Sequence, residues 1–175
     1  PPTYVNSGLL VLKLSTTGVY KGTLTQGKTR TKFGGQFDQL GNATATIVRA
    51  GLSTLTMALH LDGNGTDQIT GTVGDGSFTG SVLANRALAK SAPPSPLAGK
   101  RFTLLLPADT TNTAQTVPLG DGFGTVLIKA PGSVTLAGYA GDGQKIKQKA
   151  FISKFGTWPM YVPLYNGLGA MFGWV

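Results

Sequence analysis

The fold class follows from the stretch STLTMALHLDG, residues 53–63. Its odd positions from Leu55 to Leu61 are apolar, whereas the positions between them are small or polar. A period of two is typical of a β-strand with one buried face, and the dipeptide Asp62-Gly63 favours a hairpin turn. The stretch therefore predicts a strand that pairs with its neighbour along the chain.

The same alternation recurs along the whole chain, and helical periodicity is nearly absent. Leu10 to Leu14 and Phe102 to Leu106 are further examples, and Asp-Gly dipeptides recur at Asp75, Asp121 and Asp142. This pattern predicts an all-β fold, an antiparallel meander of about 12–13 short strands. We expect the meander to close into a β-barrel, because closure removes exposed strand edges. Two small β units or a β-sandwich are the alternatives.

Two stretches of similar rhythm indicate an internal repeat. Residues 11–41 and 126–156 both run strand, Gly turn, strand, Gly turn and basic strand. A duplication explains this likeness, and the alternative is that separate hairpins use the same turn residues. Because of this repeat, we expect the barrel to be built from two related halves.

The chain is expected to form one domain, residues 1–175. Its halves are residues 1–89 and 97–175, and the Pro-rich stretch 90–96 predicts an extended connector between them. A second irregular stretch, Ala108 to Gly120, is rich in Thr and Asn and predicts a long loop.

Composition argues against most enzyme chemistry. The seven acidic residues are all Asp, there is one His, and there is no Cys. Four of the seven Asp precede Gly and are explained by turns. His60 lies two residues from Asp62, but no Gly-x-Ser-x-Gly motif positions a nucleophile, so we expect a surface histidine. We therefore expect no catalytic residue, no metal site and no cofactor.

Net charge points toward acidic partners. The chain carries a formal charge of +8, and two stretches place a cation at every second position. In a strand such trios share one face with charges about 6.5–7 Å apart, a spacing suited to a polyanion backbone. The two trios are Lys28, Arg30, Lys32 and Lys145, Lys147, Lys149.

The sequence nevertheless favours a merely solvated face for both trios, because Phe33 and Phe151 beside them differ in facing and predict no aromatic platform. We expect weak, salt-sensitive binding of a glycan or another acidic polymer, and no specific binding of nucleic acid.

Aromatic side chains are concentrated at the C-terminus, where the last 18 residues hold both tryptophans, two tyrosines and one phenylalanine. The favoured interpretation is that they fill the core between the closing strands. The alternative is a ligand site, because such side chains stack on sugar rings, with either these residues or the 108–120 loop at the barrel mouth. The candidate ligand-binding residues are Trp158, Tyr161, Tyr165 and Trp174.

The stretch Gly156 to Tyr165, GTWPMYVPLY, followed by Phe172-Gly173-Trp174, resembles a domain of large secreted or surface proteins of environmental bacteria. That domain often lies beside Ig-like repeats, and Gly18 to Leu24 is similar to it as well. The resemblance implies a secreted or cell-surface location as part of a longer chain. It implies no activity and no functional residues.

These observations favour a non-catalytic structural or binding module of an extracellular bacterial protein, acting in adhesion, display or spacing. One alternative is a ligand-binding barrel for a glycan or a small apolar molecule, and another is an enzyme of unfamiliar type. A large aromatic-lined pocket would favour the ligand-binding barrel. The longest apolar runs, such as Leu9 to Leu12, are too short to span a membrane.

Overall fold

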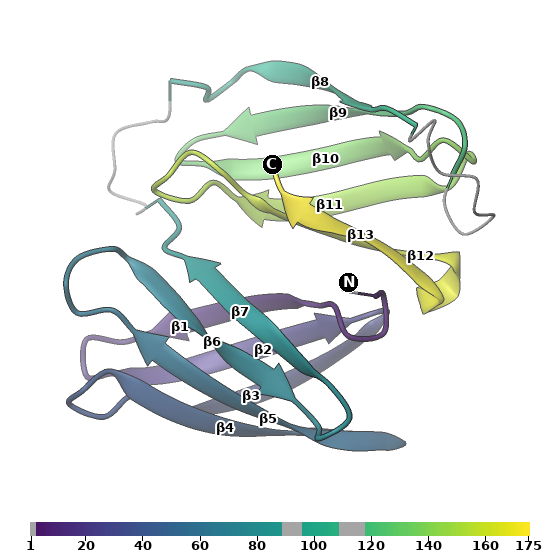
Figure 1. Ribbon diagram of the computed structural model, residues 1–175. Coiled ribbons are helices and arrows are strands. Elements are labelled where there is room, and N and C mark those ends of the chain that lie inside the picture. Colours follow the sequence, from purple (N-terminus) through teal and green to yellow (C-terminus); the bar gives the residue numbers. More distant parts are fainter. Residues whose placement is uncertain (1–2, 89–95, 109–117) are drawn as a thin grey trace. The chain divides into compact units, whose positions relative to one another are not determined.

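The computed structural model describes residues 3–88, 96–108 and 118–175, which form thirteen strands and one short 3-10 turn, Tyr165–Gly167 (Figure 1). The chain divides into two compact units. Unit 1 takes in Pro1–Arg86 and Asn166–Ala170, and unit 2 takes in Ala87–Tyr165 and Met171–Val175.

Unit 1 contains two antiparallel sheets, in which each strand pairs with its neighbour in sequence. The first sheet has the order β1-β2-β3 and the second has the order β4-β5-β6-β7. The strands are β1 (Leu9–Leu14), β2 (Val19–Gln26), β3 (Thr29–Gln36), β4 (Asn42–Arg49), β5 (Leu52–Leu61), β6 (Gln68–Gly74) and β7 (Thr79–Asn85).

The core of unit 1 is built from the apolar positions of both sheets. Leu55, Met57 and Leu59 of β5 are all buried, as their alternation predicted. They belong to one apolar cluster with Tyr20 of β2 and Ile47 of β4. The side chains between them face the solvent, so each strand has one buried and one exposed face.

Unit 2 contains a four-stranded antiparallel sheet of order β11-β10-β9-β8 and a hairpin, β12-β13 (Figure 1). The first residues of β13 belong to unit 1. The strands are β8 (Arg101–Leu106), β9 (Gly122–Lys129), β10 (Ser133–Tyr139), β11 (Lys145–Phe151), β12 (Pro159–Leu164) and β13 (Gly169–Trp174).

One face of the β8–β11 sheet packs into the core of unit 2. Val134 and Leu136 of β10 and Ile146 of β11 are fully buried there, together with Trp158 and Val162. Because side chains alternate along a strand, the residues between these positions point to the opposite face of the sheet. That opposite face is where the candidate site lies.

The prediction of an all-β, antiparallel fold is confirmed, and so is the strand number. Within the described residues the strands form four separate sheets, and no closed barrel is found. The single-barrel domain therefore stays a prediction. Most of the predicted connector 90–96, and residues 109–117 of the predicted loop 108–120, lie outside the described residues.

The stretches proposed as a repeat each contain a three-stranded meander, β1-β2-β3 and β9-β10-β11. Successive hairpins produce this likeness without any duplication, so the repeat also stays a prediction.

The four Asp-Gly dipeptides do not all behave as predicted. Gly76 and Gly143 adopt positive φ in turns, and each preceding Asp accepts a hydrogen bond from a backbone N–H two residues on. After Asp62, however, the positive φ falls on Gly65. Asp121-Gly122 is no turn: Gly122 begins β9, and Asp121 instead accepts a hydrogen bond from the Ala108 N–H at 2.8 Å. An Asp carboxylate can accept a hydrogen bond from a backbone N–H in a distant loop as well as from one in its own turn. The Asp-Gly dipeptide alone does not show which of these bonds forms.

Candidate functional site

The predicted C-terminal basic trio occupies one face of strand β11. Lys145, Lys147 and Lys149 are exposed, whereas Ile146 between them is buried in the core. The trio therefore lines the solvent face of the four-stranded sheet, as its alternation predicted. β11 pairs with β10 along its whole length, so the register shows which residues lie beside each lysine.

The register of the sheet arranges its solvent face in four cross-strand rows. We call this surface the basic-aromatic face. Each row is written from β8 to β11, except the last, which begins at β9. The rows are Leu105–Phe123–Tyr139–Lys145, Thr103–Thr125–Ala137–Lys147, Arg101–Leu127–Thr135–Lys149 and Lys129–Ser133–Phe151.

The first row forms an exposed apolar and aromatic strip that ends at a lysine. Phe123 is 58% exposed, Tyr139 is 42% exposed and Leu105 is 59% exposed. The ring centroids of Phe123 and Tyr139 lie 6.0 Å apart with planes inclined at 44°. Tyr139 is paired directly with Lys145. The expectation that no aromatic platform lies beside the trio is therefore wrong.

The backbone beneath this row requires glycine. Gly124 and Gly138 are paired directly and lie on the core side, one residue along each strand from the exposed Phe123–Tyr139 pair. A Cβ added to Gly138 would collide with the Phe123 carbonyl and the Gly124 Cα, which are backbone atoms that cannot move aside cheaply. The glycines thus let β9 and β10 approach closely where they carry the aromatic pair.

All charges at the positions of the basic-aromatic face are positive. Besides the trio, the register brings in Arg101 of β8 and Lys129 of β9. Within the described residues, none of the five cations forms an ion pair. Since no carboxylate neutralises them, they produce a positive potential on this one surface.

The carboxylate in the turn beside Tyr139 and Lys145 is already engaged. Asp142, in the turn between β10 and β11, accepts hydrogen bonds from the Tyr165 hydroxyl and the Gln144 N–H. The bond from Tyr165, and then that from Gln144, hold the pKa of Asp142 below its ordinary value, although burial opposes them. The same contact raises the pKa of Tyr165. Tyr165 therefore stabilises a turn, which argues against its predicted role as a free ligand platform.

A side chain of β11 links this strand to β12. The Gln148 amide donates a hydrogen bond to the Pro159 carbonyl at 2.9 Å and accepts one from the Tyr161 N–H at 2.8 Å. These bonds satisfy backbone groups of β12 that would otherwise lack a partner from β11. The strand that carries the lysines is thus held by backbone pairing with β10 and by the Gln148 side chain to β12.

The N-terminal trio is split by the structure. Arg30 and Lys32 lie on the exposed face of β3, whereas Lys28 lies in the turn before it and donates a hydrogen bond to Asn166 Oδ1 at 2.7 Å. Lys13 and Lys21, a directly paired couple, share the exposed face with Arg30 and Lys32. We call these four cations the basic face of unit 1. No aromatic residue occupies a position on that face.

The C-terminal aromatic residues do not form one surface. Trp158 and Tyr161 are each 4% exposed, so neither ring presents a face to a ligand. Trp174 is 40% exposed. The core interpretation is therefore confirmed for Trp158 and is wrong for Trp174. The aromatic residue type alone does not distinguish a buried ring such as Trp158 from an exposed ring such as Trp174, because burial depends on which strands pack against each ring.

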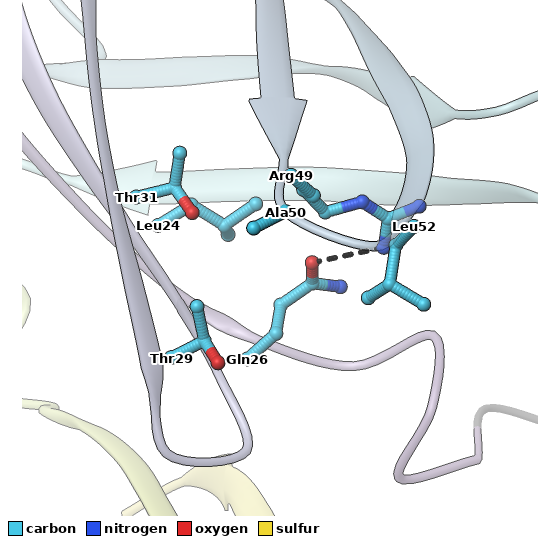
Figure 2. Close-up of a pocket in the computed structure, with 7 residues that line it drawn as sticks. All are labelled: Leu24, Gln26, Thr29, Thr31, Arg49, Ala50 and Leu52. Carbon is cyan, nitrogen blue, oxygen red and sulfur yellow. Dashed lines mark hydrogen bonds between the residues drawn. The ribbon is translucent and has the colours of Figure 1, made fainter.

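A small cavity lies at one end of unit 1, between Leu24, Gln26, Thr31 and the turn that holds Arg49 and Leu52 (Figure 2). Its volume of about 60 Å³ suffices for water molecules but not for a sugar or a drug-sized ligand, which need about 300–1,000 Å³. A second, open hollow of about 480 Å³ lies against the exposed face of β5 and β6 and is lined mainly by Thr and Gly. Neither has an aromatic lining residue.

The polar groups around the small cavity are paired with one another. The Arg49 guanidinium donates to Asp75 Oδ2 at 3.0 Å and to Gln26 Oε1 at 3.2 Å. Asp75 also accepts from the Ser53 hydroxyl and from Ser77. These hydrogen bonds, that from Ser53 first, hold the pKa of Asp75 far below its ordinary value. The cluster ties three turns together and leaves no reactive group free.

The remaining chemical candidates give no site. His60 is exposed, and its Nδ1 lies 2.9 Å from Asn42 Oδ1. The part of the chain that the structure describes contains no group of three potential metal ligands. Nor does any helix in that part have the length and apolar character needed to cross a membrane.

No protein-family model matches the chain, and no match was found among curated proteins or solved structures. The basic-aromatic face of unit 2 is the strongest candidate site, because it combines five cations with an exposed aromatic pair.

Proposed function

We propose that the chain is a non-catalytic module of an extracellular bacterial protein and that it binds acidic polymers through the basic-aromatic face. One observation carries the binding role: five cations on one sheet face, with no carboxylate among its positions. The extracellular location rests on the resemblance of the GTWPMYVPLY stretch. Binding of this kind supports a role in adhesion or display. The alternative of a ligand-enclosing barrel has less support, because the cavity of about 60 Å³ is too small for a sugar and the hollow of about 480 Å³ is open and has no aromatic lining residue.

Retention of the chain on immobilised heparin and DNA, measured as a function of salt, tests the proposal. Five phosphate contacts predict a slope of log affinity against log salt no steeper than about −4.5 for duplex DNA. The variant Lys145→Gln/Lys147→Gln/Lys149→Gln should make the slope shallower by about 3, because three counterion-releasing contacts are lost. Lack of retention even at low salt would contradict the proposal.

A matched control separates a specific surface from net charge. The variant Lys13→Gln/Lys21→Gln/Arg30→Gln removes the same charge from the basic face of unit 1. If retention follows the basic-aromatic face, this control should lose distinctly less affinity than the β11 triple variant. Equal losses would show that the protein binds through its overall charge of +8.

A further inference from the structure

We infer that the acidic polymer is single-stranded nucleic acid, bound without sequence preference, with bases stacked on Phe123 and Tyr139 and phosphates along the β11 lysines. The inference rests on the proposed function and names the ligand class of the same face. It starts from the row in which an aromatic pair ends directly at Lys145.

Two sets of side chains that could contact a ligand meet on this face, an aromatic row and a column of lysines. The aromatic row crosses the strands, and the lysine column runs along β11 with side chains about 7 Å apart. Tyr139 lies one strand spacing, about 4.8 Å, from the column. A ligand that contacts both the aromatic row and the lysine column must carry repeated anionic groups and, beside them, planar apolar groups. A single nucleic acid strand has this chemistry, because each phosphate is followed by a base with a π face.

The strand has to be unpaired. In a duplex the base faces are covered by their neighbours in the stack, so Phe123 and Tyr139 would gain nothing from the bases. Stacking of single-stranded bases on aromatic side chains of an antiparallel sheet is an established mode of recognition. The exposed rings here, 6.0 Å apart and tilted by 44°, offer two adjacent stacking positions.

An acidic glycan fits the face less well. Sugars present many hydroxyl groups, which need acceptors in addition to an aromatic platform. The positions of the basic-aromatic face contain no carboxylate and no amide. Besides the Tyr139 hydroxyl, their uncharged polar side chains are Thr103, Thr125, Thr135 and Ser133. Gln148, the nearest amide on β11, is engaged with the backbone of β12.

The same inventory explains why no sequence preference is expected. Discriminating between bases requires several donors and acceptors fixed against the base edge, and amide, carboxylate and guanidinium groups provide the most selective pairings. The aromatic row offers Leu105 and Lys145 there, and Arg101 lies two rows away. A single flexible lysine that also contacts phosphate provides little discrimination. Stacking accepts every base, because each has a π face.

The test compares oligonucleotides of equal charge with and without bases. Fluorescence anisotropy of the full chain would be measured with an oligothymidylate of about 15 nucleotides, an abasic strand of the same length and the corresponding duplex. We expect the oligothymidylate to bind at least about tenfold more tightly than the abasic strand. Equal affinity for the two would overturn the inference, although it would leave acidic-polymer binding intact.

Variants assign this difference to the aromatic pair. Phe123→Ala/Tyr139→Ala should abolish the preference for the strand with bases and change heparin affinity less than about twofold. Phe123→Leu/Tyr139→Leu keeps apolar side chains on the strands and should also lose the preference for the strand with bases. This second variant keeps the test valid if the alanine variant does not fold. The control Lys13→Gln/Lys21→Gln/Arg30→Gln should keep the preference.

The two proposals fail differently. Tighter binding of heparin than of single strands, unaffected by either aromatic variant, would overturn the nucleic acid inference and support a glycan partner. If neither heparin nor any oligonucleotide binds at low salt, the proposed function itself fails.

Discussion

Tyr20→Phe should stabilise the protein. The Tyr20 side chain is 1% exposed and packs between Phe33 and Phe37, with ring centroids 6.2 Å and 5.1 Å away. Within the described residues its hydroxyl finds no hydrogen-bond partner. Leaving a buried hydroxyl unpaired costs about 1–3 kcal/mol, so its removal should raise the free energy of unfolding by about 1–2 kcal/mol. Phenylalanine keeps the ring contacts.

The assay is urea unfolding at two pH values, with Tyr4→Phe as a control in which an exposed hydroxyl is removed. Burial raises the pKa of Tyr20 above its unfolded value of about 10. The folded state therefore holds the proton more tightly, and stability falls as pH rises above about 10. The advantage of Tyr20→Phe should thus be larger at alkaline pH than at neutral pH. A loss of about 1 kcal/mol or more at neutral pH would refute the reasoning, because it would mean that the hydroxyl has a partner.

Gly35 gives a second, independent check on the same hydroxyl. A Cβ added there would lie 2.7 Å from the Tyr20 hydroxyl oxygen, closer than real Cβ contacts. Gly35 does not adopt positive φ, so Gly35→Ala tests contact and not backbone strain. The substitution should cost about 1–3 kcal/mol in the parent and less in the Tyr20→Phe background, since the closest atom is gone. Additive effects would contradict this placement of the ring.

Three further predictions concern stability. Trp158→Ala should cost about 3–5 kcal/mol, whereas Trp174→Ala should cost clearly less because that ring is 40% exposed; chemical unfolding of both variants checks the difference. Asp75→Asn should lower the urea midpoint near pH 6, and the gap to the parent should close as pH falls below about 4, because a carboxylate with a lowered pKa loses its stabilising effect on protonation. The full chain should unfold in one calorimetric transition, because Asn166–Ala170 of unit 1 lies between two segments of unit 2; two resolved transitions would contradict this.

Local pattern was enough to predict the strands. The stretch 53–63 became β5, Leu52–Leu61, because a period of two needs only neighbours along the chain. Closure of the strands into a barrel was harder to predict, since it depends on which sheet edges meet. The role of an Asp-Gly dipeptide was hard to predict for a similar reason, because it depends on which distant backbone groups lie near the carboxylate. Asp121 looks like a turn residue in sequence, but its carboxylate accepts from Ala108, a donor thirteen positions earlier.

The lysine trio on β11 could be predicted, but the aromatic pair Phe123 and Tyr139 beside it was missed. Alternation places Lys145, Lys147 and Lys149 on one face without any knowledge of other strands. Tyr139 enters only through pairing across the hairpin, although a signal was present: the Asp142-Gly143 turn lies midway between Tyr139 and Lys145. Phe123 requires the register of a further strand pair, which no short motif specifies.

The aromatic row matters because salt acts differently on its contribution and on that of the lysines. Between about 50 and 200 mM salt, five phosphate contacts with a single strand lose roughly 100-fold in affinity. Stacking on Phe123 and Tyr139 releases no counterions, so salt leaves that contribution nearly unchanged. The basic face of unit 1, with cations alone, should therefore lose most of its binding in this range. The basic-aromatic face should retain a base-dependent part at the higher salt, and it is this part that would distinguish a nucleic-acid-binding surface from one that is merely positively charged.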